Sequence, residues 1–304
     1  MTAEAPILVC GAAGRVGRTG NFVARQLLGR GLKVRAWVRT DDERAAVLRD
    51  AGAEVLVGDM DVIADYRRAL RGVRRAYFTG AVVEQLTSQT TMFAVAARDE
   101  GVEAVVNMSQ FTVKEDTPSP ATRQHWLSEH LLEWSGLPVV TIRPSLFAEQ
   151  LSMLAGPTIR MFDEIRMPFG ELPVAFIGGW DIARVITEVL TDPVPHMGAT
   201  YRLTGAQALT MKEISAEFSK VLGRSITYLD IPVERYREYL LKAGRSEHLV
   251  AHLCSLSQKM KAGEFAEVTT TVADLTGTPT RPLEDFITEE RDRFAPQPLP
   301  ANAA

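Results

Sequence analysis

Apolar runs alternate with amphipathic segments along the first half of the chain. The first run, ILVC at residues 7–10, precedes a segment with apolar residues at helical spacing, and this pairing repeats to about residue 147. Near-continuous Val, Ile and Leu runs are typical of parallel strands buried on both faces. Repeated strand–helix units predict an α/β fold with a doubly wound parallel sheet. The predicted strands cover residues 7–10, 32–39, 53–59, 73–80, 102–109 and 137–144, and the predicted helices 21–31, 41–52, 61–72, 83–100 and 121–135.

The alternation ends after Phe147. Residues 151–180 are rich in Pro and Gly, which predicts loops and short strands there. Thr210 and Glu213 form a capping-box sequence at the start of a later helix. We expect a sheet domain in residues 1–150 that is rejoined by part of 174–230. A smaller interleaved α+β domain for a substrate or partner is expected in 151–295, followed by a disordered tail at 296–304.

A glycine-rich loop follows the first strand and opens the first helix. The sequence ILVCGAAGRVGRTG holds glycines at 11, 14, 17 and 20. Strand, glycine turn and helix together present backbone N–H groups and a helix N-terminus to a phosphate, and the glycines let a pyrophosphate approach closely. The alternative is an ordinary tight turn. We expect residues 1–150 to be a dinucleotide-binding domain, with pyrophosphate contacts from Gly11, Ala13, Gly14, Arg15, Val16 and Gly17.

We expect the rest of this site at the carboxyl ends of the other strands, because ligands of doubly wound sheets bind there. Arg39 ends the second strand, where a guanidinium favours the 2′-phosphate of NADP(H) over NAD(H). Asp41 and Asp42 are interpreted as acids that cap the next helix. Asp59 would accept from an adenine amino group, or cap the following helix. The remaining predicted cofactor contacts are Met60 on the adenine ring and Gly80, Ala81, Pro144 and Phe147 near the nicotinamide.

Ser109 and His125 are the candidate catalytic residues. Ser109 ends the fifth strand, where it would bind a substrate carbonyl or cap a turn. His125 lies on a predicted helix whose apolar stripe is Leu127, Leu131 and Trp134, so it should point away from that stripe. An imidazole there could relay a proton near neutral pH, or be a surface or structural residue. Trp126 and Trp180 could line an aromatic pocket or simply pack.

Composition limits the classes of function. A net charge of −4 and 46% hydrophobic residues are ordinary for a soluble globular protein and indicate no direct nucleic-acid surface. No apolar run approaches the ~18 residues of a membrane span, and the N-terminus lacks a secretory signal. The two cysteines fit a cytoplasmic protein, and His248 with His252 lacks a third ligand, so we expect no metal.

The chain resembles the NmrA-like family of atypical short-chain dehydrogenases/reductases. The resemblance rests on ILVCGAAGRVG, VRAWVR, AEVLVGD, GVEAVVNMSQ, HWLSEHLLEWSGLPVVTIRPSLFAE, DIARVITEVL and YRLTGAQALT. It implies a Rossmann sheet, a smaller C-terminal domain, a cleft between them and a preference for NADP(H). Ser109 matches the serine of the superfamily. Two departures follow: residues 18–20 look like an insertion, and the Tyr-x-x-x-Lys pair is replaced by Ala121 and His125.

Three functions remain open on the sequence alone. The first is an NADPH-dependent oxidoreductase that transfers hydride to a quinone-like or conjugated carbonyl compound, a small apolar or aromatic substrate. The second is a non-catalytic NADP(H) redox sensor that acts through a regulatory protein partner, which the missing Tyr and Lys favour. The third is a ketoreductase that works without the tyrosine.

Overall fold

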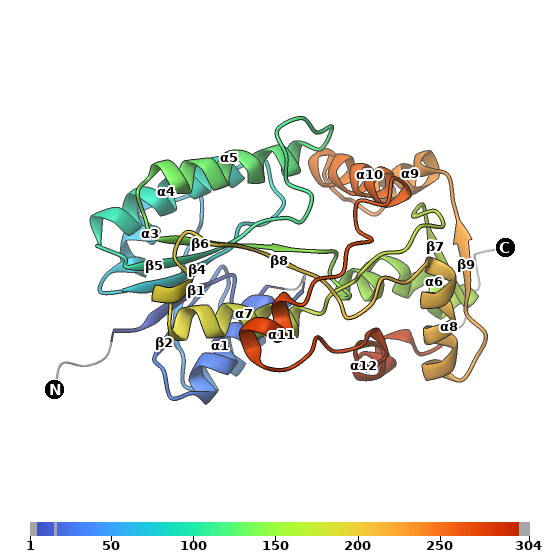
Figure 1. The fold of residues 1–304 in the computed structure, drawn as a ribbon, viewed down its shortest axis with the longest axis horizontal. Coiled ribbons are helices and arrows are strands. Elements are labelled where there is room, and N and C mark those ends of the chain that lie inside the picture. The colour runs from blue at the N-terminus through green and yellow to red at the C-terminus, as the bar shows by residue number, and fades with distance from the viewer. Residues whose placement is uncertain (1–4, 15–16, 298–304) are drawn as a thin grey trace.

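The computed structural model describes residues 5–14 and 17–297. Within this part of the chain a seven-stranded sheet has the order β3-β2-β1-β4-β5-β6-β8, and every pairing in it is parallel (Figure 1). The strand order reverses between β1 and β4, which creates a crevice at the carboxyl edge. The strands are β1 (Ile7–Cys10), β2 (Val34–Val38), β3 (Glu54–Val57), β4 (Arg75–Phe78), β5 (Ala104–Met108), β6 (Val139–Pro144) and β8 (Thr200–Leu203).

Helices cover both faces of this sheet (Figure 1). Ile7 and Val9 of β1 pack in the core beneath α1 and α7, whereas Leu8 and Cys10 pack in the core beneath α3 and α4. Because both faces are buried, the strand reads as a continuous apolar run rather than an alternating one. One layer holds α1 (Thr19–Gly29), α2 (Glu43–Asp50), α7 (Gly179–Thr191) and α11 (Thr271–Thr276), and the other holds α3 (Ile63–Leu70), α4 (Leu86–Asp99) and α5 (Pro120–Trp134). The predicted doubly wound parallel sheet is confirmed.

A second hydrophobic core lies beyond the carboxyl edge of the sheet, on the right in Figure 1. There β7 (Glu164–Met167) pairs in parallel with β9 (Thr227–Asp230). Phe169, Phe218 and Tyr236 are buried in this core. Its helices are α6 (Gly156–Phe162), α8 (Met211–Leu222), α9 (Val233–Lys242), α10 (Glu247–Lys261) and α12 (Leu283–Glu289). Between these elements α7 and β8 return to the main sheet, so the two parts interleave along the chain.

One local expectation is corrected, one short helix is additional, and one expectation is confirmed. Residues 151–162 form a π-helical turn, Leu151–Ala155, and then α6, rather than loops. Pro157 lies in the first turn of α6, where a missing N–H costs no helical hydrogen bond, so here proline begins a helix. The short α11 was not anticipated. The capping box is present: Thr210 Oγ1 accepts from the Glu213 N–H at 3.2 Å, and the Glu213 carboxylate accepts from the Thr210 N–H at 2.8 Å.

The last described residues are held against α6. The Gln297 N–H donates to the Arg160 carbonyl oxygen at 3.0 Å, so the start of the segment expected to be disordered is bonded. Residues 298–304 lie outside the described residues. None of the helices in the described ranges is long and apolar enough to cross a membrane.

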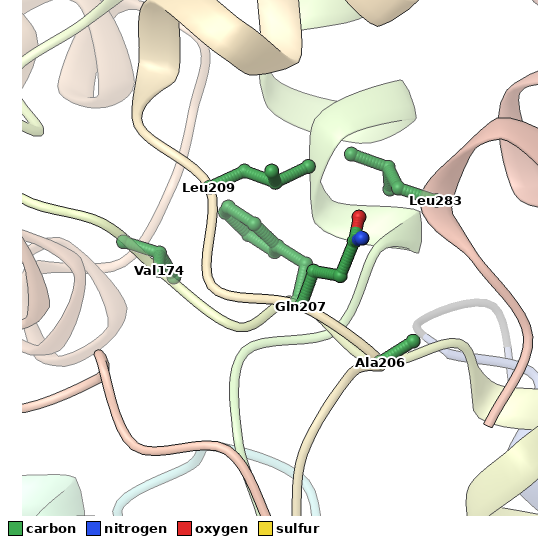
Figure 2. Close-up of a pocket in the computed structure, with 6 residues that line it drawn as sticks. Val174, Ala206, Gln207, Leu209 and Leu283 are labelled. Atoms are coloured by element: carbon green, nitrogen blue, oxygen red, sulfur yellow. The ribbon is translucent and has the colours of Figure 1, made fainter. Parts of the chain in front are cut away.

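A small cavity lies within the second core, beside the start of α12 (Figure 2). It has a volume of about 10 Å³, room for about one water molecule. Leu209, Leu283 and the amide of Gln207 face it. It is too small to accept a cofactor or substrate.

Candidate cofactor and substrate site

The glycine loop connects β1 to α1 through a left-handed turn. Gly17 has φ +65° and Arg18 has φ +47°, and α1 begins directly afterwards at Thr19. A Cβ on Gly20 would lie 2.6 Å from the carbonyl oxygen of Gly11, so only glycine lets the first turn of α1 approach the end of β1 this closely. Residues 18–20, which the sequence marks as an insertion, therefore include the glycine that packs helix against strand. Arg15 and Val16 lie outside the described residues.

The start of α1 offers unsatisfied donors to an anion. In the described part of the chain no side chain caps this helix, and the buried Thr19 Oγ1 has no hydrogen-bond partner. Backbone N–H groups in a first helical turn have no acceptor within the helix, and the helix dipole favours negative charge there. Thr19, Gly11 and Gly14 also line the large cavity of the molecule. These residues fit the pyrophosphate of a dinucleotide.

That cavity has a volume of about 490 Å³ and follows the carboxyl edge of the sheet. The ends of β1, β4, β5 and β6 form one wall, and one face of α10 forms the opposite wall. Nine of the predicted site residues line it: Gly11, Gly14, Met60, Gly80, Ala81, Ser109, His125, Pro144 and Phe147. The structure therefore brings both ends of the predicted site into one space. Ala13, Gly17, Arg39 and Asp59 lie outside this lining.

Arg39 and Asp59, which follow β2 and β3, do not line the cavity. Arg39 is exposed. Asp42 caps α2 as predicted, because its side chain accepts from the Arg44 N–H at 3.0 Å and the Ala45 N–H at 3.4 Å. The Arg44 guanidinium also donates to the Ala13 carbonyl, which joins α2 to the glycine loop.

Asp59 does not cap a helix. Its carboxylate accepts from the Asp61 N–H at 2.9 Å, and α3 begins only at Ile63, after Val62. The alternative interpretation of Asp59 as a helix cap is therefore wrong. Its neighbour Met60 lines the cavity.

The expected orientation of α5 is corrected. Leu127 and Trp134 of the predicted apolar stripe are 41% and 77% exposed. The buried face instead carries Ala121, His125 and Ser128. Ser128 can be buried because its hydroxyl is bonded to Thr90 Oγ1 at 3.0 Å, and small side chains on this face let α5 pack closely on α4.

This orientation places His125 inside the protein, against the cavity. Burial lowers the pKa of His125 to about 4. The expectation of an imidazole that titrates near neutral pH is therefore wrong, since desolvation disfavours the charged ring. At neutral pH His125 acts only as a neutral hydrogen-bonding group.

A second histidine, His252 on α10, lines the same cavity. Its Nδ1 lies 2.9 Å from Ser119 Oγ, which also accepts from the Thr122 N–H at 3.1 Å. Among the described residues no other acceptor serves the Ser119 hydroxyl hydrogen, which assigns it to His252 Nδ1 and leaves the ring proton on Nε2. Burial, reinforced by neighbouring His125 and Lys259, lowers the pKa of His252 to about 3. His252 is therefore a neutral donor.

Sequence reasoning considered His252 only as a metal ligand. On α10 it shares a face with Leu249, Leu253 and Leu256, and the whole face lines the cavity. That helical spacing is visible in the sequence, but it does not reveal which surface the helix covers. Within the described ranges, no group of three or more His, Cys, Asp and Glu residues could hold a metal.

Besides Thr19 Oγ1, two more buried hydroxyls at the cavity have no partner among the described residues. Ser109 Oγ and Ser145 Oγ form no hydrogen bond in the described part of the chain, and both residues line the cavity. Buried polar groups in native proteins are nearly always paired with protein or ordered water, so each of these two hydroxyls still has a hydrogen bond to give to a water or a ligand.

The aromatic lining is different from the one considered from the sequence. Trp126 packs on His130 with ring centroids 4.3 Å apart, and Trp180 packs edge-on against Phe22. Neither tryptophan lines the cavity, whereas Phe111 and Phe265 do.

Glu149 joins the second half of the chain to the glycine loop. Its carboxylate accepts from the Gly179 N–H at 2.9 and 3.2 Å, and burial raises the pKa of Glu149 to about 7. A Cβ on Gly179 would fall 1.8 Å from the Gly17 carbonyl oxygen, so α7 begins directly against the loop. No pattern in the sequence indicated this contact.

Comparison with known proteins places the chain in a family. A reductase of (4-alkanoyl-5-oxo-2,5-dihydrofuran-3-yl)methyl phosphate from Streptomyces griseus is 34% identical over 292 residues, which cover 96% of this chain and 100% of the relative. An NAD(P)H azoreductase from Xenophilus azovorans is 30% identical over 282 residues, covering 92% of this chain and 96% of the relative.

The fold is also found in a solved structure of another protein. The structure of Citrobacter sp. triphenylmethane reductase complexed with NADP(H) is similar with a TM-score of 0.79 at 23% identity, over 93% of this chain and 99% of that one. The model of the NmrA-like family matches residues 3–287. This chain belongs to the NmrA-like family.

Proposed function

We propose that this chain is an NADPH-dependent oxidoreductase that transfers hydride to a quinone-like or conjugated carbonyl substrate. The observation that carries the proposal is the single cavity that runs from the glycine loop to His125 and His252. It offers an anion-binding end and an apolar end with neutral hydrogen-bond donors. The names of the two relatives support it: one is a reductase of an oxo-dihydrofuran compound and the other an NAD(P)H azoreductase.

The residues present fit a nicotinamide dinucleotide, which would supply the hydride when bound. We assign the pyrophosphate to the loop that holds Gly11, Ala13, Gly14, Arg15, Val16 and Gly17. Arg39 would bind the 2′-phosphate, which makes NADP(H) the preferred cofactor. Asp59 and Met60 would contact the adenine. The nicotinamide end belongs to four residues that all line the cavity, Gly80, Ala81, Pro144 and Phe147.

The acceptor would be held by the opposite wall. Leu249, Leu253 and Leu256 of α10 suit a flat apolar body and exclude water. A quinone oxygen gains negative charge as it is reduced, and preorganised donors in a water-poor site stabilise that charge. Ser109 Oγ and the Nε2–H of His252 are such donors, with His125 beside them.

This donor set offers a physical reason why the missing tyrosine need not abolish reduction. Ala121, at the position that matches the tyrosine, is buried on α5 and has no proton to give. A quinone is an easier hydride acceptor than a simple ketone, so hydrogen bonds from neutral groups can be sufficient. The proton that completes the hydroquinone would come from solvent at the cavity mouth.

The test is single-turnover oxidation of NADPH with a panel of quinones, followed by stopped-flow absorbance. We expect acceleration over the enzyme-free rate with at least one acceptor. If NADPH binds but no acceptor accelerates its oxidation, the enzyme assignment fails. The sensor that acts through a protein partner would then become the better description, while reduction of simple ketones alone would favour the tyrosine-free ketoreductase.

A further inference from the structure

The charge carried by the side chains of the cavity wall is of one sign, positive. Among the described residues that line the cavity, Arg245 is the only charged side chain, and no Asp or Glu is present. Arg245 lies directly before Ser246, the residue that caps the N-terminus of α10. Its side chain is exposed, and no carboxylate in the described ranges is within ion-pair distance of it. The guanidinium therefore stands at the mouth of the cavity without a counter-charge.

A second cation lies directly behind the wall. Lys259 of α10 is buried, and its Nζ donates to the Thr112 carbonyl at 3.1 Å and to Thr112 Oγ1 at 2.9 Å. Thr112 lines the cavity. In the part of the chain that the structure describes, Lys259 also has no ion-pair partner, although burial lowers its pKa to about 8. The ammonium is thus still largely protonated at neutral pH.

Two nearby cations that do not line the cavity are neutralised by carboxylates. Arg237 pairs with Glu247 at 2.7 Å, and Arg202 pairs with Glu267 at 2.6 Å. The difference matters because a paired cation contributes little field, whereas an unpaired one at a low-dielectric opening attracts anions. Arg245 therefore makes the α10 end of the cavity positive, and Lys259 adds less because the nearby Glu264 carboxylate acts on its charge.

The other groups at this end do not attract an anion by charge. Both His125 and His252 are neutral at physiological pH, and the intervening surface of α10 is leucine. A molecule that uses this wall fully would present a flat apolar body to the leucines and one anionic group to the guanidinium.

We propose that the acceptor of this reductase carries an anionic substituent, a carboxylate, sulfonate or phosphate, that Arg245 binds at the mouth of the cavity. This rests on the proposed function, because it extends the same site by naming the substrate class. Arg245 selects among acceptors through a charge-assisted hydrogen bond, and Lys259 adds a long-range field. The conjugated carbonyl then lies toward the histidines, on the side away from Arg245.

The probes are naphthoquinone and naphthoquinone sulfonate, a neutral and an anionic acceptor with the same ring system. Their Kd values are measured by calorimetry on the full chain with NADP⁺, and their kcat/KM values with NADPH. The readout is the preference, defined as the affinity (1/Kd) or kcat/KM for the anionic probe divided by the same quantity for the neutral probe. Comparing this ratio between variants cancels the different intrinsic reactivities of the two quinones.

For Arg245→Ala we expect the preference for the sulfonate to fall about tenfold, the effect of one charge-assisted hydrogen bond. Arg245→Lys should keep part of the preference, because it retains the charge and loses the bidentate geometry. Lys242→Ala is the matched control, since it removes an exposed cation from the neighbouring helix that does not line the cavity. Its preference should equal that of the wild type.

The outcomes separate the two proposals. A preference that Arg245→Ala leaves unchanged overturns the anionic subsite, even if both quinones are reduced. A loss of NADPH affinity in Arg245→Ala with an unchanged preference also overturns it, because the guanidinium then serves the cofactor. If the sulfonate binds in an Arg245-dependent way and neither quinone is reduced, the subsite stands and the reductase assignment falls.

Discussion

The two walls of the cavity are built in different ways. The cofactor edge is made of strand ends and a glycine loop, so its groups are mainly backbone N–H donors and small residues, and those of the loop follow one another along the chain. The α10 wall is made of side chains from distant segments; Ser119 and His252 are hydrogen-bonded although 133 residues separate them. A local motif therefore creates the glycine-loop part of the first wall and the meeting of parallel strand ends creates the rest, whereas the packing of α10 against α5 creates the second wall.

The difference implies that substitutions at the two walls should separate cofactor binding from acceptor chemistry. A change at the glycine loop should weaken the cofactor whatever the acceptor. A change at the α10 wall should alter turnover while the cofactor still binds. The following variants test that separation, starting with the largest expected effect.

Gly20→Ala should have the largest effect. The new Cβ meets backbone, the Gly11 carbonyl oxygen at 2.6 Å, so the loop or the helix must move. We expect destabilisation of about 3 kcal/mol, the upper part of the range for overpacking, together with loss of NADPH binding. Chemical denaturation and calorimetry measure the two effects.

Gly29→Ala is the matched control in the same helix. Nothing lies within 4 Å of the position that its Cβ would take, and alanine should raise helix stability by up to about 1 kcal/mol. If Gly20→Ala behaves like Gly29→Ala, the close packing of α1 on β1 does not shape the cofactor edge.

His125→Ala should lower quinone turnover by roughly 10², the usual contribution of a hydrogen-bonding group positioned at a developing charge. Binding of NADPH should change little, since the residue lies on the acceptor side. His130→Ala is the control on the same helix, because His130 packs on Trp126 outside the cavity. Equal losses in both variants would show that the effect comes from α5 stability.

The pH dependence offers a second check on the same wall. Since burial holds the pKa of His125 at about 4 and that of His252 at about 3, both rings stay neutral throughout the range in which an ordinary histidine titrates. We expect kcat/KM for quinones to show no titration near the ordinary histidine pKa of about 6.5. A clear titration at that pH would contradict the neutral-donor assignment.

Glu149→Gln tests how far the cofactor edge depends on a distant segment. Burial raises the pKa of Glu149 from 4.5 to about 7, so the folded state holds a proton that the unfolded chain has lost between these pH values. Stability should therefore fall by about 3 kcal/mol as pH rises through this window, and then stay constant.

Glutamine keeps an oxygen acceptor for the Gly179 N–H and removes the titration, so the variant should lose this fall. Thermal unfolding from pH 4.5 to pH 8 measures it, with the exposed Glu133→Gln as control. The same pH slope in wild type and Glu149→Gln would mean that other groups cause it.

Arg39→Ala should have the smallest effect, about a tenfold loss of affinity for NADPH with little change for NADH, as for one charge-assisted contact. Arg25→Ala on α1 removes an equally exposed cation away from the cavity and should affect neither cofactor. Equal losses for NADPH and NADH in Arg39→Ala would remove Arg39 from the 2′-phosphate site.

Prediction from the sequence was most successful where neighbouring residues decide the structure. The strand at residues 7–10, the capping box at Thr210 and the cap at Asp42 were all confirmed, because each depends on a few adjacent residues. It failed on α5, where counting apolar residues selected the exposed face and missed the buried hydroxyl pair of Ser128 and Thr90. A polar residue can be buried when its partner is present, and that partner lies on another helix.

The sequence by itself determined the doubly wound sheet, the glycine loop at its edge and the meeting of the strand ends, since parallel strands with short local connections leave few other arrangements. Tertiary structure alone decided that Gly20 packs the helix, that His125 is buried and neutral, and that α10 brings His252 and Arg245 to the same cavity. The physical reason is the distance along the chain over which each effect acts. Backbone geometry and turn chemistry act over a few residues, whereas burial, the pKa values and the charge of a cavity depend on every segment that surrounds it.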